Sequence, residues 1–203
     1  HTGILAARMT AIQDKWDQRY RERSAPGEPC QLLQQFIDIL PAHGRALDLA
    51  CGLGGNADLL ARRGLDCDAV DISQVAVDTL RDYAQEARLP IYAQQWDIES
   101  AGLPTGPYQV VVVSHYLHRP LLPQLPSILA PGGLLLYQTF NDAGPVRRGP
   151  NKAAFRLQPD ELLSHFKALD TLYHRQDFPV GVGGETAFVG RKIDGARPAG
   201  NGG

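Results

Sequence analysis

A glycine-rich turn between two apolar runs, with an acidic residue ending the second run, is the part of this sequence most suited to chemistry. Residues 46–56 read ALDLACGLGGN, so an apolar run around Asp48 leads into a turn that begins at Gly52. Glycine tolerates positive φ and lets a ligand approach the bare backbone. A helix starting there directs its free N–H groups to the same place. Asp71 follows about 20 residues later, where a carboxylate can accept hydrogen bonds from a ribose diol. This arrangement predicts a nucleotide-type cofactor site.

Two kinds of cofactor fit the glycine pattern. The string Gly52-x-Gly54-x-x-Ala57 satisfies the dinucleotide fingerprint, which accepts alanine at its last position. Asp48, inside the first strand, would repel the pyrophosphate of NAD and attract a ligand that carries an ammonium and a sulfonium. A further acidic residue, Asp97, closes a third candidate strand in IYAQQWDIE. These acids favour a cationic cofactor with a ribose over a dinucleotide.

With the late segment LAPGGLLLYQTF, these motifs resemble the class I S-adenosylmethionine-dependent methyltransferases over roughly residues 45–140. WDQRY near the start, HYLHRPLL and the later GPN and FRLQPDELL are similar to the small bacterial TehB-like (tellurite-resistance type) methyltransferases. The resemblance implies S-adenosylmethionine as methyl donor and S-adenosylhomocysteine as product. It also implies a small-molecule acceptor, such as tellurite, selenite or another small nucleophile, which takes the methyl group by in-line displacement.

The resemblance assigns cofactor contacts residue by residue. The glycines would let the backbone approach the methionine part, and Asp71 would accept the ribose hydroxyls. Ile72 and Ile98 would sandwich the adenine, and Asp97 would accept its amino group. The expected cofactor-binding residues are Asp48, Ala50, Gly52, Gly54, Asn56, Asp71, Ile72, Trp96, Asp97, Ile98 and Ser114.

A purely structural role is open for each of the three acids. Asp71 and Asp97 could cap the helices or turns that start beside them, since aspartate is common at such positions. Asp48 could be a buried strand residue that is hydrogen-bonded to nearby amides.

The segment HYLHR, directly after the fourth candidate strand, supplies the candidates for the acceptor side. His115 is the candidate catalytic base, because imidazole exchanges protons near neutral pH, although a base is needed only if the acceptor must lose a proton. The spacing His115-x-x-His118 suggests a metal, but no third ligand lies nearby, so we expect none. The expected substrate-contacting residues are Trp16, Tyr20, Tyr116, Arg119 and Arg147.

Two of these expectations have purely structural alternatives. Trp16 and Tyr20 lie one turn apart on a predicted helix, which could be a lid over the cleft or a permanently packed element. Arg147 belongs to a basic loop over 141–157, which could clamp an anionic substrate or be a solvated surface loop.

The order of predicted elements indicates an α/β fold. Strands are expected at about 45–50, 66–71, 91–96, 108–114, 133–140, 169–177 and 185–192, and helices at about 10–23, 30–40, 55–63, 73–88, 121–129 and 159–166. Alternating strands and helices followed by a terminal hairpin predict a mostly parallel sheet with helices on both faces. A Rossmann-like seven-stranded sheet of order 3-2-1-4-5-7-6, with the last strand antiparallel, is what the resemblance implies.

Size and composition set further limits. A chain of 203 residues that is 43% hydrophobic predicts one domain over 1–203. The net charge of −2 argues against nucleic acid as partner. There is no apolar run of ~18 residues and no signal-peptide pattern, so we expect neither a membrane partner nor export. Three cysteines without C-x-x-C spacing predict a cytoplasmic protein.

Within this single domain, residues 1–9 read as a tag remnant or a flexible tail, and 10–40 as N-terminal helices over the cleft. Residues 195–203 read as a disordered tail. We expect a monomer or a weak homodimer.

Two other functions remain open at this stage. An NAD(P)-binding Rossmann oxidoreductase fits the glycine string, although no Tyr-x-x-x-Lys pair supplies a hydride-transfer site. A non-catalytic cofactor-binding module would keep the pocket without turnover.

Overall fold

The structure, a computed structural model, describes residues 2–194 and contains one seven-stranded sheet in the order β3-β2-β1-β4-β5-β7-β6. The strands are β1 (Arg45–Leu49), β2 (Asp66–Asp71), β3 (Ile91–Gln95), β4 (Tyr108–Ser114), β5 (Leu129–Phe140), β6 (Leu169–Phe178) and β7 (Glu185–Lys192). Strands β1 to β5 pair in parallel, whereas β7 is antiparallel to both β5 and β6. The expected strand order, the antiparallel last strand and the terminal hairpin are confirmed.

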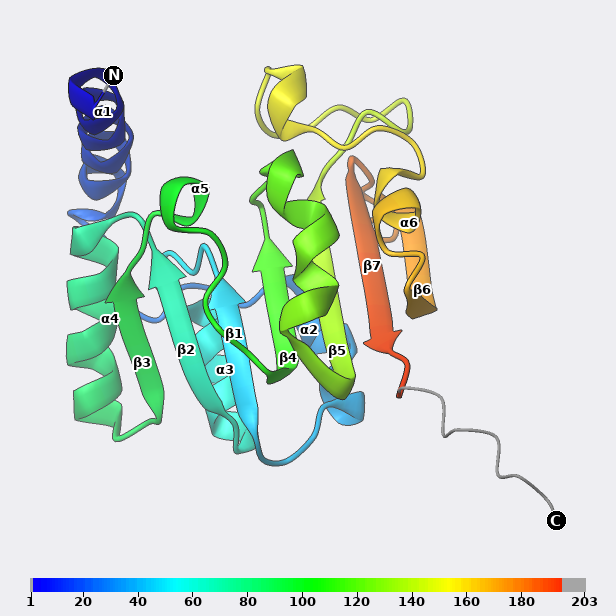
Figure 1. The fold of residues 1–203 in the computed structure, drawn as a ribbon, viewed down its shortest axis with the longest axis horizontal. Helices are drawn as coiled ribbons and strands as arrows, with labels where there is room; N and C mark the ends of the chain where they lie inside the picture. The colour runs from blue at the N-terminus through cyan, green and yellow to red at the C-terminus, as the bar shows by residue number, and fades with distance from the viewer. Residues whose placement is uncertain (1, 195–203) are drawn as a thin grey trace, which may run out of the picture.

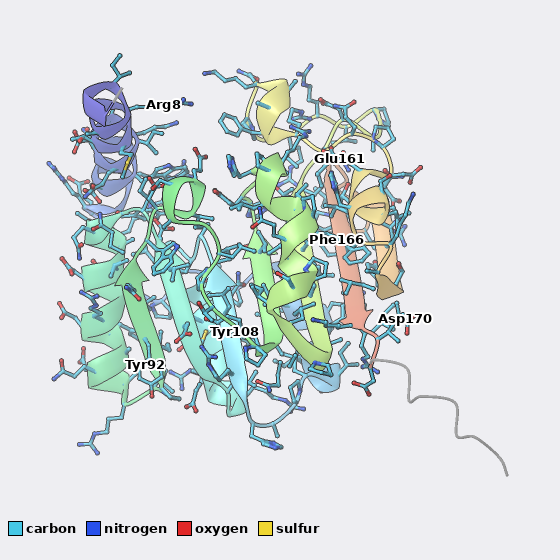
Figure 2. All side chains as sticks on the ribbon, in the orientation of Figure 1. Arg8, Tyr92, Tyr108, Glu161, Phe166 and Asp170 are labelled. Atoms are coloured by element: carbon cyan, nitrogen blue, oxygen red, sulfur yellow. The ribbon has the colours of Figure 1, made fainter. Side chains whose placement is uncertain are left out.

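Helices cover both faces of the sheet, as expected (Figure 1). One apolar cluster joins the sheet to α2 (Gln31–Gln35), α3 (Gly55–Arg63) and α4 (Gln74–Ala87). The opposite cluster joins it to α5 (Ile98–Ala101), η2 (Arg119–Ile128) and α6 (Glu161–His165), and Figure 2 labels two of its members, Tyr108 and Phe166. The remaining elements are α1 (Thr2–Tyr20), η1 (Ile37–Ile39) and η3 (Ala153–Phe155).

Local sequence explains the elements nearest the site. Strand β4 carries four consecutive valines, 110 to 113, which are all buried because the strand lies between the two apolar layers. Gly54 and Gly64 adopt left-handed conformations at the two ends of α3. Ser73 caps α4, and its hydroxyl accepts a hydrogen bond from the Ala76 amide at 3.1 Å.

Several predicted element boundaries were wrong. The helix expected over 30–40 is split at Phe36, whose backbone leaves the helical region (φ −106°, ψ 19°). The helix expected over 121–129 is a run of 3₁₀ turns that contains Pro123 and Pro126, which lack the N–H that α-helical bonding needs. Strand β5 begins at Leu129 rather than at 133.

The N-terminal helix also differs from its expected range of 10–23. Helix α1 spans Thr2–Tyr20, so residues 2–9, which read as a tail, continue it. The tail expected over 195–203 lies outside the described residues. Among residues 2–194, no helix is both long and apolar enough to span a bilayer.

A buried arginine organises the long connection between β5 and α6. Only 1% of Arg156 is exposed, and its Nε donates to Asp142 Oδ1 at 2.6 Å. Its other nitrogens donate to the carbonyl oxygens of Asn141 at 2.6 Å, Pro150 at 3.1 Å and Arg148. The segment predicted as a polar surface loop is therefore held to the sheet by an internal charged residue.

We expect Arg156→Met to lower the free energy of unfolding by about 3 kcal/mol, because three carbonyl groups and the Asp142 carboxylate lose their donor. Urea denaturation measures the loss. The neighbouring Arg147→Met is the matched control, since the Arg147 side chain is 65% exposed, and it should change stability by less than about 0.5 kcal/mol. Equal stability of the two variants would contradict a structural role for Arg156.

Candidate cofactor and acceptor site

The candidate site lies where the chain leaves β1 and β4 in opposite directions. Strand β1 pairs with β2 on one side and with β4 on the other, which makes this the switch in strand order. In open parallel sheets, ligands bind beyond the carboxyl ends of the strands at this point. In Figure 1 these ends share the upper edge, with α1 beyond them at the left. The predicted cofactor residues lie within or just after the carboxyl-terminal ends of β1, β2, β3 and β4 at this edge.

The glycine turn adopts the backbone that its sequence predicts. Ala50, Gly52 and Gly54 have φ values of +56°, +52° and +73°. A Cβ on Gly52 would lie 2.7 Å from the hydroxyl oxygen of Tyr20, and one on Gly54 would meet Leu80. Side chains are therefore excluded here both by the turn conformation and by the close approach of α1 and α4.

Asp71 is held rigidly at the end of β2. Its carboxylate accepts hydrogen bonds from the amides of Gly52 at 2.8 Å and Ser73 at 2.9 Å, one to each oxygen. Burial raises the pKa of Asp71, and repulsion from Asp17 adds to the effect, while the two amides oppose it. Each oxygen keeps a further lone pair. Asp71 thus fulfils the capping role that the sequence left open and can still accept hydrogen bonds from a ligand.

Asp48 is the buried strand acid that was the structural alternative. Only 1% of it is exposed, and its Oδ2 accepts a hydrogen bond from the Ala57 amide at 2.9 Å. Its Oδ1 is buried without a hydrogen-bond partner among the described residues. Burial raises the pKa of Asp48 to about 8. A cationic ligand nearby would favour the ionised form of this carboxyl group.

Asn56 and Ser114 join three segments of the site. The Asn56 side chain accepts from the Cys30 amide at 2.8 Å and donates to the Ser114 hydroxyl at 2.9 Å. Asn56 is buried. Its amide therefore positions α3 against the end of β4, a role that the predicted cofactor contact did not anticipate.

The residues after β2 and β3 form an apolar and polar rim. Asp97 caps α5, accepting from the Glu99 amide at 3.2 Å and the Ser100 hydroxyl at 2.8 Å. Ile98 is buried and Ile72 half-buried. The indole of Trp96 donates to a backbone carbonyl, that of residue 102, at 2.8 Å.

His115 belongs to a pair that sequence reasoning missed. Its Nε2 contacts Oε1 of Glu185, and its ring stacks on Phe140 with the centroids 4.9 Å apart. The His115 backbone is left-handed, with φ +52°, although it is not glycine. The histidine side chain is 46% exposed and that of Glu185 3%. Glu185 lies 70 residues further along the chain, and no local pattern in the sequence connects the two.

Arg119, another predicted acceptor-side residue, makes its hydrogen bonds within the protein. Four N–H groups of Arg119 donate to the Glu161 carboxylate, at 2.6 and 3.1 Å, and to the carbonyl groups of Ala154 and Arg156. Arg119 therefore forms a structural ion pair with Glu161 and has few N–H groups left to donate to a substrate. Tyr116 stays near the site, and burial raises the pKa of its phenol, with Glu99 adding to the effect.

Helix α1 is attached at the start of α4. Asp17 accepts hydrogen bonds from the Ser73 hydroxyl at 2.6 Å and the Val75 amide at 3.2 Å. Trp16 stacks on Tyr20 with the centroids 6.1 Å apart, and Arg19 lies 5.3 Å from the Trp16 ring. Tyr20 consequently lies on the glycine turn, whereas these contacts of Trp16 are within α1.

Comparison with known proteins identifies the family. Residues 18–180 match the model of a methyltransferase domain, so the chain belongs to this methyltransferase family. The structure of TehB from Haemophilus influenzae is similar, with a TM-score of 0.67 and 19% identity over 89% of this chain and 66% of that one. A TehB-like S-adenosylmethionine-dependent methyltransferase from Corynebacterium glutamicum gives a TM-score of 0.62 and 17% identity over 90% and 99%.

Curated relatives match over shorter segments. Hemagglutinin 1 of Eikenella corrodens is 31% identical over 73% of this chain and 51% of its own length. A ubiquinone biosynthesis O-methyltransferase of Coxiella burnetii is 27% identical over 54% and 48%. The chain thus spans about half the length of these relatives. The family match and the sheet order together show that the chain contains a methyltransferase domain with the fold of TehB.

The raised pKa of Asp48 predicts a pH dependence of stability. The fold favours the neutral carboxyl group, so this contribution is fully present below the unfolded pKa of about 3.9 and is lost as the pH rises through about 8. Urea unfolding of the wild type should show this decline between those limits, and Asp48→Asn should remove it. Asp66→Asn, at an exposed position in β2, is the control. Parallel curves for the wild type and Asp48→Asn would overturn the assignment.

Proposed function

We propose that the protein transfers the methyl group of S-adenosylmethionine to a small-molecule nucleophile at the β1–β4 switch point. The observation that carries this proposal is Asp71, a carboxylate fixed by two amides beside the glycine turn and able to accept further hydrogen bonds. When bound, S-adenosylmethionine supplies an electrophilic methyl group on a positively charged sulfur. The protein has to align the two reactants and exclude water.

The residues present fit this donor. Asp71 would accept hydrogen bonds from the ribose hydroxyls, and the unpaired, buried Oδ1 of Asp48 would attract the cationic methionine portion. Ile72 and Ile98 would contact the adenine. Asp97 would accept a hydrogen bond from the amino group of the adenine, with lone pairs that the α5 cap leaves free.

The acceptor belongs on the β4 side of the site. Tyr116 and the half-exposed His115 follow β4, one strand along from the glycine turn. Relatives named ubiquinone biosynthesis O-methyltransferase support a small organic acceptor that is methylated on oxygen. The similar structures of TehB and of a TehB-like methyltransferase support the proposal that this chain is a small methyltransferase of the same fold.

Two alternative functions differ from methyl transfer in the ligand bound or in the product formed. An NAD(P)-dependent oxidoreductase is disfavoured by the family and by the buried acid directly before the glycine turn, where a pyrophosphate would be repelled. A non-catalytic module would bind S-adenosylmethionine without forming methylated product.

The proposal extends to the protein's surroundings. Its three cysteines, Cys30, Cys51 and Cys67, are free, which supports a reducing cytoplasm. The net charge of −2 supports a partner other than nucleic acid. A monomer or weak homodimer is the proposed state, which sedimentation measures.

Calorimetry tests the proposed function. The wild type should bind S-adenosylmethionine and S-adenosylhomocysteine, and Asp71→Asn should weaken both by about 1.5–3 kcal/mol, because charge-assisted bonds to the ribose are lost. Asp66→Asn in the same strand should bind normally. Circular dichroism verifies that each variant is folded. Absence of binding at millimolar S-adenosylmethionine, or saturable binding of NAD(H) instead, would refute the proposal.

A further inference from the structure

The pair formed by His115 and Glu185 bears on what kind of acceptor the enzyme takes. We propose that Glu185 is a positioning residue that holds the His115 imidazole as a base, and that the acceptor is a hydroxyl compound that must lose a proton. This inference rests on the proposed function, because the base is useful only beside a methyl donor. Glu185 would thus join the site although no local sequence pattern indicates it, and the acceptor would be a compound with a hydroxyl group.

The carboxylate of Glu185 is built into the sheet. Glu185 is the first residue of β7 and pairs in register with Phe140, the last residue of β5. Because β7 is antiparallel, its beginning lies at the edge where the parallel strands end. The Glu185 side chain is 3% exposed, and its Oε2 lies 3.6 Å from Nη1 of Arg148. Gln138 Nε2 lies 3.5 Å from Oε1. The buried carboxylate thus has a cationic neighbour and an amide neighbour in addition to His115.

His115 is held in one orientation. Its left-handed backbone is unfavourable for a residue with a side chain and persists only where the surroundings determine it. Those surroundings are the Phe140 ring, the Glu185 carboxylate and the Gln138 carbonyl, which accepts from the His115 amide at 2.8 Å. Backbone strain at a strand end, combined with a rigidly held side chain, is typical of functional positions.

The pairing also decides which nitrogen faces a substrate. Nε2 is directed at Glu185, so a neutral imidazole donates its proton there and carries a lone pair on Nδ1. Within residues 2–194, Nδ1 makes no hydrogen bond, and nearly half of the side chain is exposed. A purely structural ion pair would require neither the exposed second nitrogen nor the strained backbone.

The histidine is connected to the cofactor side through its neighbour. Ser114 precedes His115 and accepts a hydrogen bond from Asn56, in the helix that follows the glycine turn. Strands β1 and β4 are adjacent and in register up to Leu49 and Val113. Adjacent strands lie about 4.8 Å apart, so the base stands one strand from the turn expected to hold the methyl donor.

The reaction follows from this arrangement. Nδ1 of His115 accepts the hydroxyl proton while the acceptor oxygen forms a bond to the methyl carbon. The carbon–sulfur bond breaks, and its electron pair stays on sulfur as a neutral thioether. The imidazolium faces the Glu185 carboxylate, which stabilises its charge until the proton passes to water. A nucleophile without a proton to lose, such as iodide, would not need this pair.

Nitrogen NMR of ¹⁵N-histidine protein tests the positioning role independently of turnover. The His115 signals are assigned by their loss in His115→Asn. We expect the neutral ring to carry its proton on Nε2 in the wild type and in Glu185→Gln, which keeps an acceptor, and to mix tautomers in Glu185→Leu. A wild-type ring protonated on Nδ1, or a Glu185→Leu tautomer identical to the wild type, would overturn the proposal.

Methyl transfer from saturating S-adenosylmethionine is then measured with catechol and with iodide. With catechol, kcat should fall by about 100-fold or more in His115→Asn and by about 10-fold in Glu185→Gln. S-adenosylmethionine affinity, by calorimetry, should be unchanged in both. Glu86→Gln, at an exposed position in α4, should retain full activity.

The outcomes separate the two proposals. Absence of S-adenosylmethionine binding by the wild type would refute the proposed function. Three other results would refute the assignment of the pair and leave the proposed function standing, provided that S-adenosylmethionine binds normally. They are transfer to iodide alone, no transfer to catechol, and transfer to catechol that Glu185→Gln does not change.

Discussion

The central constraint in this molecule is the pairing of β1 with β2 on one side and with β4 on the other. Because the chain crosses over in opposite directions from these strands, the strand ends open a site at one edge of the sheet. The glycine turn, Asp71 and His115 come from different parts of the chain and meet only through this pairing. The hydrogen bonds of Asn56 to Cys30 and Ser114 then fix the helix after the turn against β4.

The site concentrates buried carboxylates, which a fold does not accumulate without compensation. Asp71 is compensated by two amides, Glu185 by His115 and Arg148, and Asp48 by a single amide. The raised pKa values of Asp48 and Asp71 show that burial outweighs these contacts. A ligand with hydroxyl groups and positive charge would relieve this cost, so the same feature that weakens the free protein favours binding.

The proposed acceptor side of the site depends on elements outside the parallel part of the sheet. The reversed direction of β7 brings Glu185 to the edge where β4 and β5 end. Arg156, buried within the connection between β5 and α6, donates to the carbonyl of Arg148 and so anchors the segment from which Arg148 reaches Glu185. The surroundings of the His115–Glu185 pair thus depend on one antiparallel strand and one internal arginine.

Much of the parallel half of the molecule was determined locally and could be predicted from the sequence. Four consecutive valines predict a central strand, Ser73 predicts the start of α4, and the glycine turn leading into α3 has the expected backbone. The three acids also lie where the sequence indicated: Asp48 within β1, Asp71 at the end of β2 and Asp97 just after β3. What the tertiary structure decided is the pairing of side chains: His115 with Glu185, Arg119 with Glu161, and Asn56 with Cys30 and Ser114. These contacts span 26 to 70 residues, and local periodicity carries no information about them, because they exist only after the strands have taken their order in the sheet.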